Sequence, residues 1–230
     1  MSGRAYTAAA PRPRPISVRA ARSGPAGALA LAVACVLALA LIWVIAELVP
    51  AAQLRDATAL YDFTLLAQPL VDGVANHLVH LLEPPLFVMW GLALVAIALA
   101  RERPRTALAV VAVMALAPLS AEILKPLLAH PHASVGGVFI GPASWPSGHS
   151  AAALALVLSA VLVAPARLRP LVATLGGLFT AAVGVSLLIL AWHMPSDVLG
   201  GFLVATFWAA VALAALRAAD RRWPRSRPAD

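Results

Sequence analysis

The sequence predicts an all-α membrane protein, a six-transmembrane-helix bundle. Two features of its composition point to this fold class: 62% of the 230 residues are hydrophobic and only 12% are charged. An average soluble domain has roughly 45–50% apolar and about 25% charged residues. The single cysteine, Cys35, excludes a disulfide-based scaffold. The composition therefore leaves an integral membrane protein of one domain.

Charged residues, the third feature, divide the chain into six long uncharged runs. Each run is close to the roughly 17–25 residues that an α-helix needs to cross the hydrocarbon core of a bilayer. The predicted spans are residues 23–46, 84–100, 106–121, 147–166, 170–196 and 198–216. The first run is too long for the apolar core of a signal peptide, and no cleavage site with a polar segment follows it. We therefore predict that it stays in the protein as a span.

The segment between the first two spans, residues 51–83, is predicted to hold one additional helix on the outer membrane surface. Apolar residues recur there at helical spacing, and polar residues take the opposite side. The apolar set is Leu70, Val71, Val74, Leu78 and Leu81, and the polar set is Asp72, Asn76, His80 and Glu83. A helix with this pattern lies in the membrane interface rather than across it.

The basic residues predict the orientation of the spans. If the N-terminus is inside, the inner segments 1–25, 101–105, 166–170 and 217–230 carry every lysine and arginine except Arg55 and Lys125. The positive-inside rule then places both termini in the cytoplasm. We expect basic cytoplasmic tails at both ends, residues 1–25 and 217–230, around a membrane domain at 26–216.

The net charge of +7 therefore indicates orientation in a cell (inner or plasma) membrane and not a nucleic-acid partner. The preference for arginine over lysine, with many alanines and prolines, is typical of a GC-rich bacterial genome.

The histidines are sorted to the opposite side of this map. The predicted outer side holds His77, His80, His130, His132, His149 and His193. Lys125 and Asp197 lie there too. Because ionisable groups near membrane depth are costly, they point to a functional site. The sorting therefore predicts a site at the outer face.

One outer cluster, Trp145-Pro-Ser-Gly-His-Ser150, lies at the start of the fourth span. Ser147 is a suitable helix N-cap, and Gly148 allows a ligand to approach the backbone closely. The free N–H groups of the first turn and the positive end of the helix dipole form an anion site. His149, in the same turn, would lie beside the bound anion.

Two further clusters lie at the outer ends of other spans. His193 and Asp197 are four residues apart at a helix start, so the carboxylate can hold one imidazole nitrogen and leave the other as nucleophile or base. Lys125 adds a cation, although snorkelling or pairing with Glu122 would also explain it. An anion cradle, a cation, a His–Asp pair and a second histidine are the parts of a phosphoryl-transfer site, which requires no metal and no other cofactor.

These motifs resemble the phosphatidic acid phosphatase type 2 family, a membrane branch of the acid phosphatase and vanadium haloperoxidase superfamily. The resemblance is carried by Lys125, by Pro-Ser-Gly-His at 146–149 and by His-Met-Pro-Ser-Asp-Val-Leu-Gly-Gly at 193–201. It implies a six-helix bundle that dephosphorylates lipid phosphates or diphosphates from the outer side. The implied roles are His193 as nucleophile, Asp197 as its partner, His149 as general acid, and Lys125, Ser147 and Gly148 as phosphate binders.

Two positions depart from the family pattern. The first motif of the family ends in Arg-Pro, where this chain has His132 and Ala133, and the third has an arginine where this chain has Leu187. Leucine cannot replace a guanidinium fork, and histidine replaces it only in part and only when protonated. We still count His132 among the expected phosphate binders. The alternative is a weakened or inactive member that binds lipid phosphates or acts as a scaffold.

Other functions fit the residues less well. A zinc site is one alternative, and its ligands would be His130, His132, His149, His193 and Asp197. The anion cradle and Lys125 suit a phosphate better than a dication, so we expect no metal. A transporter is disfavoured because no predicted span is interrupted in mid-membrane. The expected partners are a lipid phosphate substrate and the surrounding membrane lipids.

Overall fold

The structure is a computed structural model that describes residues 24–223. This part of the chain forms eight helices and no β-strand. The helices are α1 (Pro25–Leu48), α2 (Pro50–Thr64), α3 (Pro69–His80), α4 (Pro84–Ala100), α5 (Pro104–Leu127), α6 (Gly148–Val163), α7 (Arg169–Ile189) and α8 (Pro195–Arg222). All except α6 have proline in the first turn, where its missing N–H costs no helical hydrogen bond.

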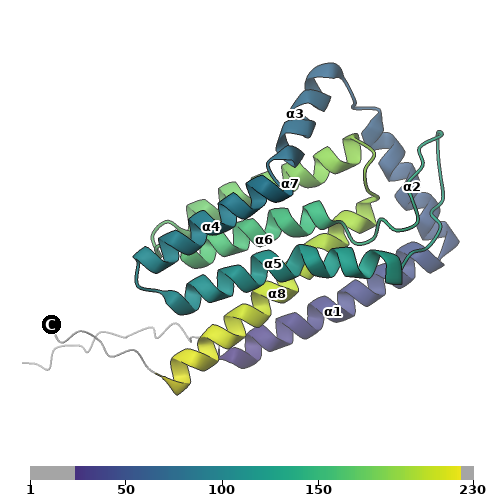
Figure 1. The fold of residues 1–230 in the computed structure, drawn as a ribbon. Coiled ribbons are helices and arrows are strands. Elements are labelled where there is room, and N and C mark those ends of the chain that lie inside the picture. Colours follow the sequence, from purple (N-terminus) through teal and green to yellow (C-terminus); the bar gives the residue numbers. More distant parts are fainter. Residues whose placement is uncertain (1–23, 224–230) are drawn as a thin grey trace, which may run out of the picture.

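Six of the helices pack side by side in an elongated bundle (Figure 1). Helix α8 contacts α1, α5 and α6, while α7 packs against α6 and α4 packs against α5 and α6. Small residues permit this close packing. Ala151, Ala153 and Ala155 of α6 are fully buried, and a Cβ on Gly176 of α7 would collide with Val157 of α6.

The apolar helices make the chain a multi-pass membrane protein. Four of the described helices, α1, α5, α7 and α8, are long and apolar enough to cross a membrane. Helices α3 and α4 together form a fifth candidate, bent by 54° at the break between them. Helix α6 is apolar but has only 16 residues. The predicted count of six spans therefore stays a prediction.

Between α1 and α4 the structure has two helices where one was predicted. Helix α3 corresponds to the predicted amphipathic helix, and it leans away from the bundle axis while contacting α7 (Figure 1). Leu70 and Val74 of α3 are 79% and 55% exposed. Helix α2, which the apolar pattern did not reveal, contacts α7 and α8. Whether these helices lie on the outer membrane surface stays a prediction.

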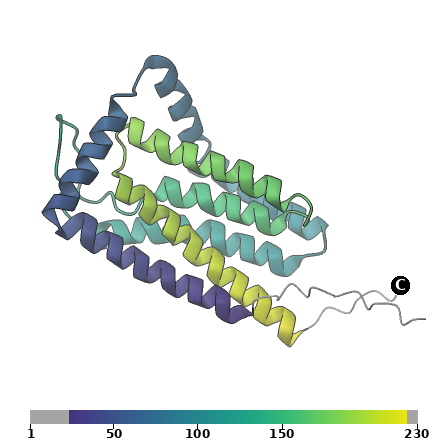
Figure 2. The same ribbon diagram turned by 180° about the vertical axis from the view of Figure 1, so that it is seen from behind.

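The two ends of the bundle carry different charges. We call one the arginine end, defined by Arg101, Arg105, Arg169, Arg217 and Arg221. The other, seen from behind in Figure 2 near the starts of α6 and α8, is the histidine end, defined by His130, His132, His149 and His193. In the described residues, four of the six histidines and these five arginines thus lie at opposite ends of the bundle. Which end faces the cytoplasm stays a prediction.

The predicted tails fall mostly outside the described part of the chain. Helix α8 continues to Arg222, so residues 217–222, which were assigned to the C-terminal tail, are helical. Residues 1–23 and 224–230, which hold the rest of both predicted basic tails, lie outside the described residues.

Candidate active site

His193 and Asp197 form a buried pair at the start of α8. The chain leaves α7 through Ala191, whose φ of 52° lies in the left-handed region, and then reaches His193. The Nδ1 atom of His193 lies 3.2 Å from Oδ2 of Asp197, which also accepts a 2.9 Å hydrogen bond from the Met194 N–H. Asp197 is fully buried, and His193 is 7% exposed. The carboxylate thus holds Nδ1 and leaves Nε2 for chemistry.

Ser147 is the N-cap of α6, as the sequence predicts. Its hydroxyl accepts a 3.3 Å hydrogen bond from the Ser150 N–H, and its own N–H donates to the Asp197 carbonyl oxygen at 2.9 Å. Helix α8 can come this close because of Gly201, where a Cβ would collide with the Ser147 carbonyl oxygen. The start of α6, with its free N–H groups, is therefore joined to the segment that carries the His–Asp pair.

Lys125 reaches the same place from α5. Its Nζ lies 2.6 Å from Oε1 of Glu122, one turn earlier on the helix. A Cβ added to Gly148 would collide with Glu122 and would lie 3.8 Å from Lys125 Nζ. The pairing with Glu122 and the proximity to the start of α6 are therefore both present, and Lys125 lies close to the cluster at residues 145–150.

His149 lies beside the turn that leads to His193. Its ring contacts the ring of Trp192 edge-on, with 5.6 Å between the centroids, and it lies within electrostatic reach of His193 and Lys125. A pocket of about 400 Å³ opens beside His193, between residues 139–144 and residues 191–193. His193 is thus one of the residues that line this pocket.

Leu187 and His132, the two residues expected from the resemblance to depart from the family pattern, lie in different surroundings. Leu187 is fully buried in the apolar core. His132 has partners at both ring nitrogens: Nδ1 lies 3.3 Å from Oε2 of Glu47, and Nε2 lies 2.9 Å from Oγ of Ser144. Burial lowers the pKa of His132, and the Asp197 charge acts in the opposite direction. His132 therefore lies at this end of the bundle, but in contact with a carboxylate.

Glu47, the charged residue that directly follows the first predicted span, belongs to this site. It lies near the end of α1, is 1% exposed, and its Oε2 is also 3.9 Å from Nδ1 of His130. A carboxylate at the end of an apolar run was the available signal. Its partner could not be foreseen, because the contact joins α1 to the loop between α5 and α6.

Asp56 of α2 is a second acidic residue that sequence reasoning missed. Its carboxylate accepts hydrogen bonds from the N–H and the hydroxyl of Ser196, at 3.2 and 2.6 Å. Burial raises the pKa of Asp56, and the hydrogen bonds from Ser196 act in the opposite direction. Asp56 thus fixes α2 to the first turn of α8, next to the His–Asp pair.

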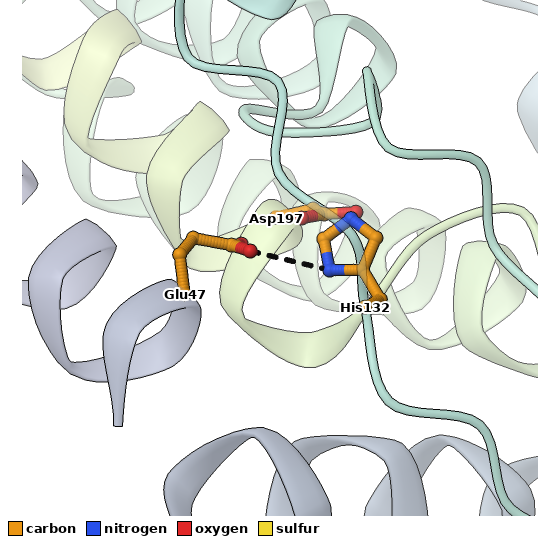
Figure 3. Close-up of side chains that lie close together, drawn as sticks. All are labelled: Glu47, His132 and Asp197. Carbon is orange, nitrogen blue, oxygen red and sulfur yellow. Dashed lines mark ion pairs between the residues drawn. The ribbon is translucent and has the colours of Figure 1, made fainter. Parts of the chain in front are cut away.

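Among the described residues, the group suited to hold a metal ion is Glu47, His132 and Asp197, drawn in Figure 3. One ligand atom from each lies within 4.8 Å of the others. This set shares His132 and Asp197 with the zinc alternative considered from the sequence. Figure 3 shows that the three side chains come from α1, from the loop before α6 and from α8.

Comparisons with known proteins identify the family. No curated protein matches this chain. The chain is similar to a solved structure, the first transmembrane PAP2 type phosphatidylglycerolphosphate phosphatase from Bacillus subtilis, with a TM-score of 0.64 and 23% sequence identity over 85% of this chain and 98% of that one. That likeness shows the fold. The family model of the PAP2 superfamily matches residues 106–221, about half of the chain and all three motif clusters, and the chain therefore belongs to the PAP2 superfamily.

Proposed function

We propose that this protein is a membrane phosphatase that hydrolyses a phosphate monoester or diphosphate on a lipid, with His193 as nucleophile. The observation that carries the proposal is the buried His193–Asp197 pair, whose carboxylate holds Nδ1 at 3.2 Å beside the start of α6. Membership of the PAP2 superfamily supports the phosphatase activity. The similar structure from Bacillus subtilis is a phosphatidylglycerolphosphate phosphatase, so this lipid phosphate belongs among the candidate substrates.

In the first step, Nε2 of His193 attacks phosphorus and the bond from phosphorus to the lipid oxygen breaks. His149 donates a proton to the departing oxygen, which leaves as a hydroxyl. Asp197 stabilises the positive charge that forms on the imidazole of the phosphohistidine. The first-turn N–H groups of α6, with Ser147 and Gly148, bind the phosphoryl oxygens, and Lys125 supplies a positive charge.

In the second step, water attacks the phosphohistidine. His149, now neutral, takes a proton from the water as its oxygen bonds to phosphorus. The bond between nitrogen and phosphorus breaks, which returns His193 to its starting state and releases inorganic phosphate. This step uses the same two histidines, so a single arrangement of the side chains serves both halves of the reaction.

The membrane setting supports a lipid as substrate. An apolar groove of about 260 Å³ lies between α1, α5 and α8, and it is lined by residues that include Ile123 and Leu124, directly before Lys125. A hydrocarbon chain in this groove would leave its head group near the histidine end. We propose that this end faces the outer side of the membrane, in agreement with the positive-inside rule.

The test is phosphate release by the detergent-purified full chain. The substrate panel contains phosphatidic acid, phosphatidylglycerol phosphate, a polyprenyl phosphate and a polyprenyl diphosphate. His193→Ala is expected to lower turnover by about 10⁴-fold or more, since removal of a nucleophile leaves little residual catalysis. His77→Ala is the matched control, because His77 is an exposed histidine of α3 whose ring forms a hydrogen bond with the Gly73 carbonyl of its own helix.

A second candidate function is binding of a lipid phosphate without turnover. Leu187 in the apolar core and His132 beside Glu47 favour it, because neither supplies an arginine fork for the transition state. One lost donor of this kind costs about 3–4 kcal/mol. Saturable binding of a panel lipid with no phosphate release, unchanged by His193→Ala, would establish this alternative and reject the phosphatase.

A further inference from the structure

We propose that Glu47, His132 and Asp197 form a binding site for a divalent transition-metal cation of the zinc type. The site combines one imidazole nitrogen with two carboxylates, a donor set that zinc uses in proteins. Its ligand atoms lie within 4.8 Å of one another and come from three separate segments of the fold (Figure 3). Metal binding at this place goes beyond the proposed function and does not depend on it.

The first argument is a set of buried carboxylate oxygens that accept no hydrogen bond. Both oxygens of Glu47 and Oδ1 of Asp197 are inaccessible to solvent and accept no hydrogen bond in the described part of the protein. Glu47 is 1% exposed and Asp197 is 0% exposed. Burial of a charge without compensation is expensive, and buried charges are normally paired or bound to metals. Oε2 of Glu47 already faces Nδ1 of His132 at 3.3 Å, so the oxygens that a cation would compensate are Oε1 of Glu47 and Oδ1 of Asp197.

The second argument is the orientation of His132. Its Nδ1 faces Oε2 of Glu47 at 3.3 Å, while its Nε2 lies 2.9 Å from the hydroxyl oxygen of Ser144. If Nε2–H donates to Ser144, Nδ1 carries a lone pair directed at the carboxylate. Metal-bound histidines usually donate their second ring N–H in this way, which fixes the tautomer and the ring. Ser144, itself buried, thus acts as a positioning residue for the ligand.

The third argument is that the two carboxylate oxygens of Asp197 have different partners. Its Oδ2 is used by His193 Nδ1 and by the Met194 N–H, whereas its Oδ1 has no donor. One carboxylate can therefore serve both the His–Asp pair and a cation. The bound ion would add positive charge at the end of the bundle where His132 and Leu187 stand in place of arginines.

The test uses the full chain in detergent after removal of metals with EDTA. Zn²⁺ content is measured after dialysis, and Co²⁺ is titrated while its visible ligand-field absorption is recorded. We expect about one ion per chain. Glu47→Gln, which keeps the shape of the side chain, is expected to weaken Co²⁺ affinity by more than about 100-fold, because loss of a ligand exceeds the effect of losing an outer hydrogen bond. His132→Gln is a second variant with the same expected loss.

Glu83→Gln is the matched control, since Glu83 lies 2.8 Å from His80 in an exposed pair of the same two residue types. Its Co²⁺ affinity should equal that of the wild type. Absence of a stoichiometric ion, or equal affinity in the wild type, Glu47→Gln and Glu83→Gln, would overturn the site. His193→Ala separates this proposal from the phosphatase, because it should retain Co²⁺ binding whether or not the wild type releases phosphate.

Discussion

The charged side chains at the arginine end and at the histidine end of the bundle differ in their burial and in their partners. At the arginine end, long side chains cover the ends of helices. Arg101 donates to the Val163 carbonyl at the end of α6, and Arg105 donates to the Ala219 carbonyl in the last turns of α8. Cations near helix C-termini satisfy free carbonyl groups and are favourable to the helix dipole. This end is thus arranged for stability.

At the histidine end, charged groups are buried and incompletely paired. The carboxylates of Glu47 and Asp197 lie inside the protein, and three of their four oxygens accept no hydrogen bond in the described structure. Such groups cost stability unless a ligand compensates them. The comparison indicates that burial of these carboxylates lowers stability at the histidine end, where reactive or ligand-binding groups are held in place. Substitutions at the two ends should therefore separate activity from stability.

The largest effect is expected from Asp197→Asn at the histidine end. It keeps the volume of the side chain but removes the charge that holds His193 and stabilises the phosphohistidine. Turnover should fall by about 10³–10⁴-fold, as for other carboxylates that orient a catalytic histidine. Phosphate release from the preferred panel lipid is the measurement. Asp62→Asn, an exposed position of α2, is the control, and equal turnover of the two variants would contradict the assigned role.

Gly201→Ala should have the next largest effect. Its Cβ would collide with the Ser147 carbonyl and lie 3.0 Å from the Ala151 backbone nitrogen, where little can move aside. Overpacking of this kind costs about 1–3 kcal/mol, so we expect a lower Tm together with lower turnover. In contrast, Gly177→Ala meets nothing within 4 Å and should leave Tm unchanged or slightly raised. A Tm of Gly201→Ala equal to that of Gly177→Ala would show that the helix starts are less tightly joined than described.

Arg101→Ala tests the arginine end. The substitution removes the 2.7 Å hydrogen bond to the Val163 carbonyl, and we expect a loss of about 1 kcal/mol in unfolding free energy. Thermal unfolding in detergent measures it. Turnover of the folded protein should stay at the wild-type value, because no residue of the candidate site is touched. A large loss of turnover at unchanged Tm would contradict the proposal that the arginine end contributes to stability and not to activity.

The smallest effect is the pH dependence of Asp56. Because burial raises the pKa of Asp56 above its ordinary value of 3.8, its contribution to stability is fully present below that value and is lost as the pH rises through the folded-state pKa. The Tm of the wild type minus that of Asp56→Asn should therefore decrease between pH 4 and pH 7. A difference that stays constant or grows with pH would contradict this account of the α2–α8 contact.

Several features of the fold could be predicted because they depend on the hydropathy of residues that are close in the sequence. The charged residues around 84–100 delimit a run that coincides with α4, Pro84–Ala100. The run at 147–166 likewise contains α6, because Pro146 and Ser147 define a helix start. Recognition of the family from its three motifs is confirmed by the match over residues 106–221. Local patterns sufficed because each of these features depends on neighbouring residues.

Other features could not be predicted from hydropathy. Helix α2 was missed because its residues mix apolar and charged types without a continuous apolar run. The end of α8 was placed too early because its last turns, up to Arg222, are charged yet still helical. In both cases the helix is stabilised by contacts with other helices, and such tertiary contacts override the local composition.

The amino-acid sequence by itself determined a helical membrane protein, the positions of most of its helices and the motif residues His149, His193 and Asp197. Only the tertiary structure decided that Glu47 of α1 lies against His132 and that Asp56 of α2 caps the start of α8. The physical reason is that hydropathy and helix signals depend on nearby residues. Contacts between distant side chains depend on how each helix is rotated and packed against its neighbours.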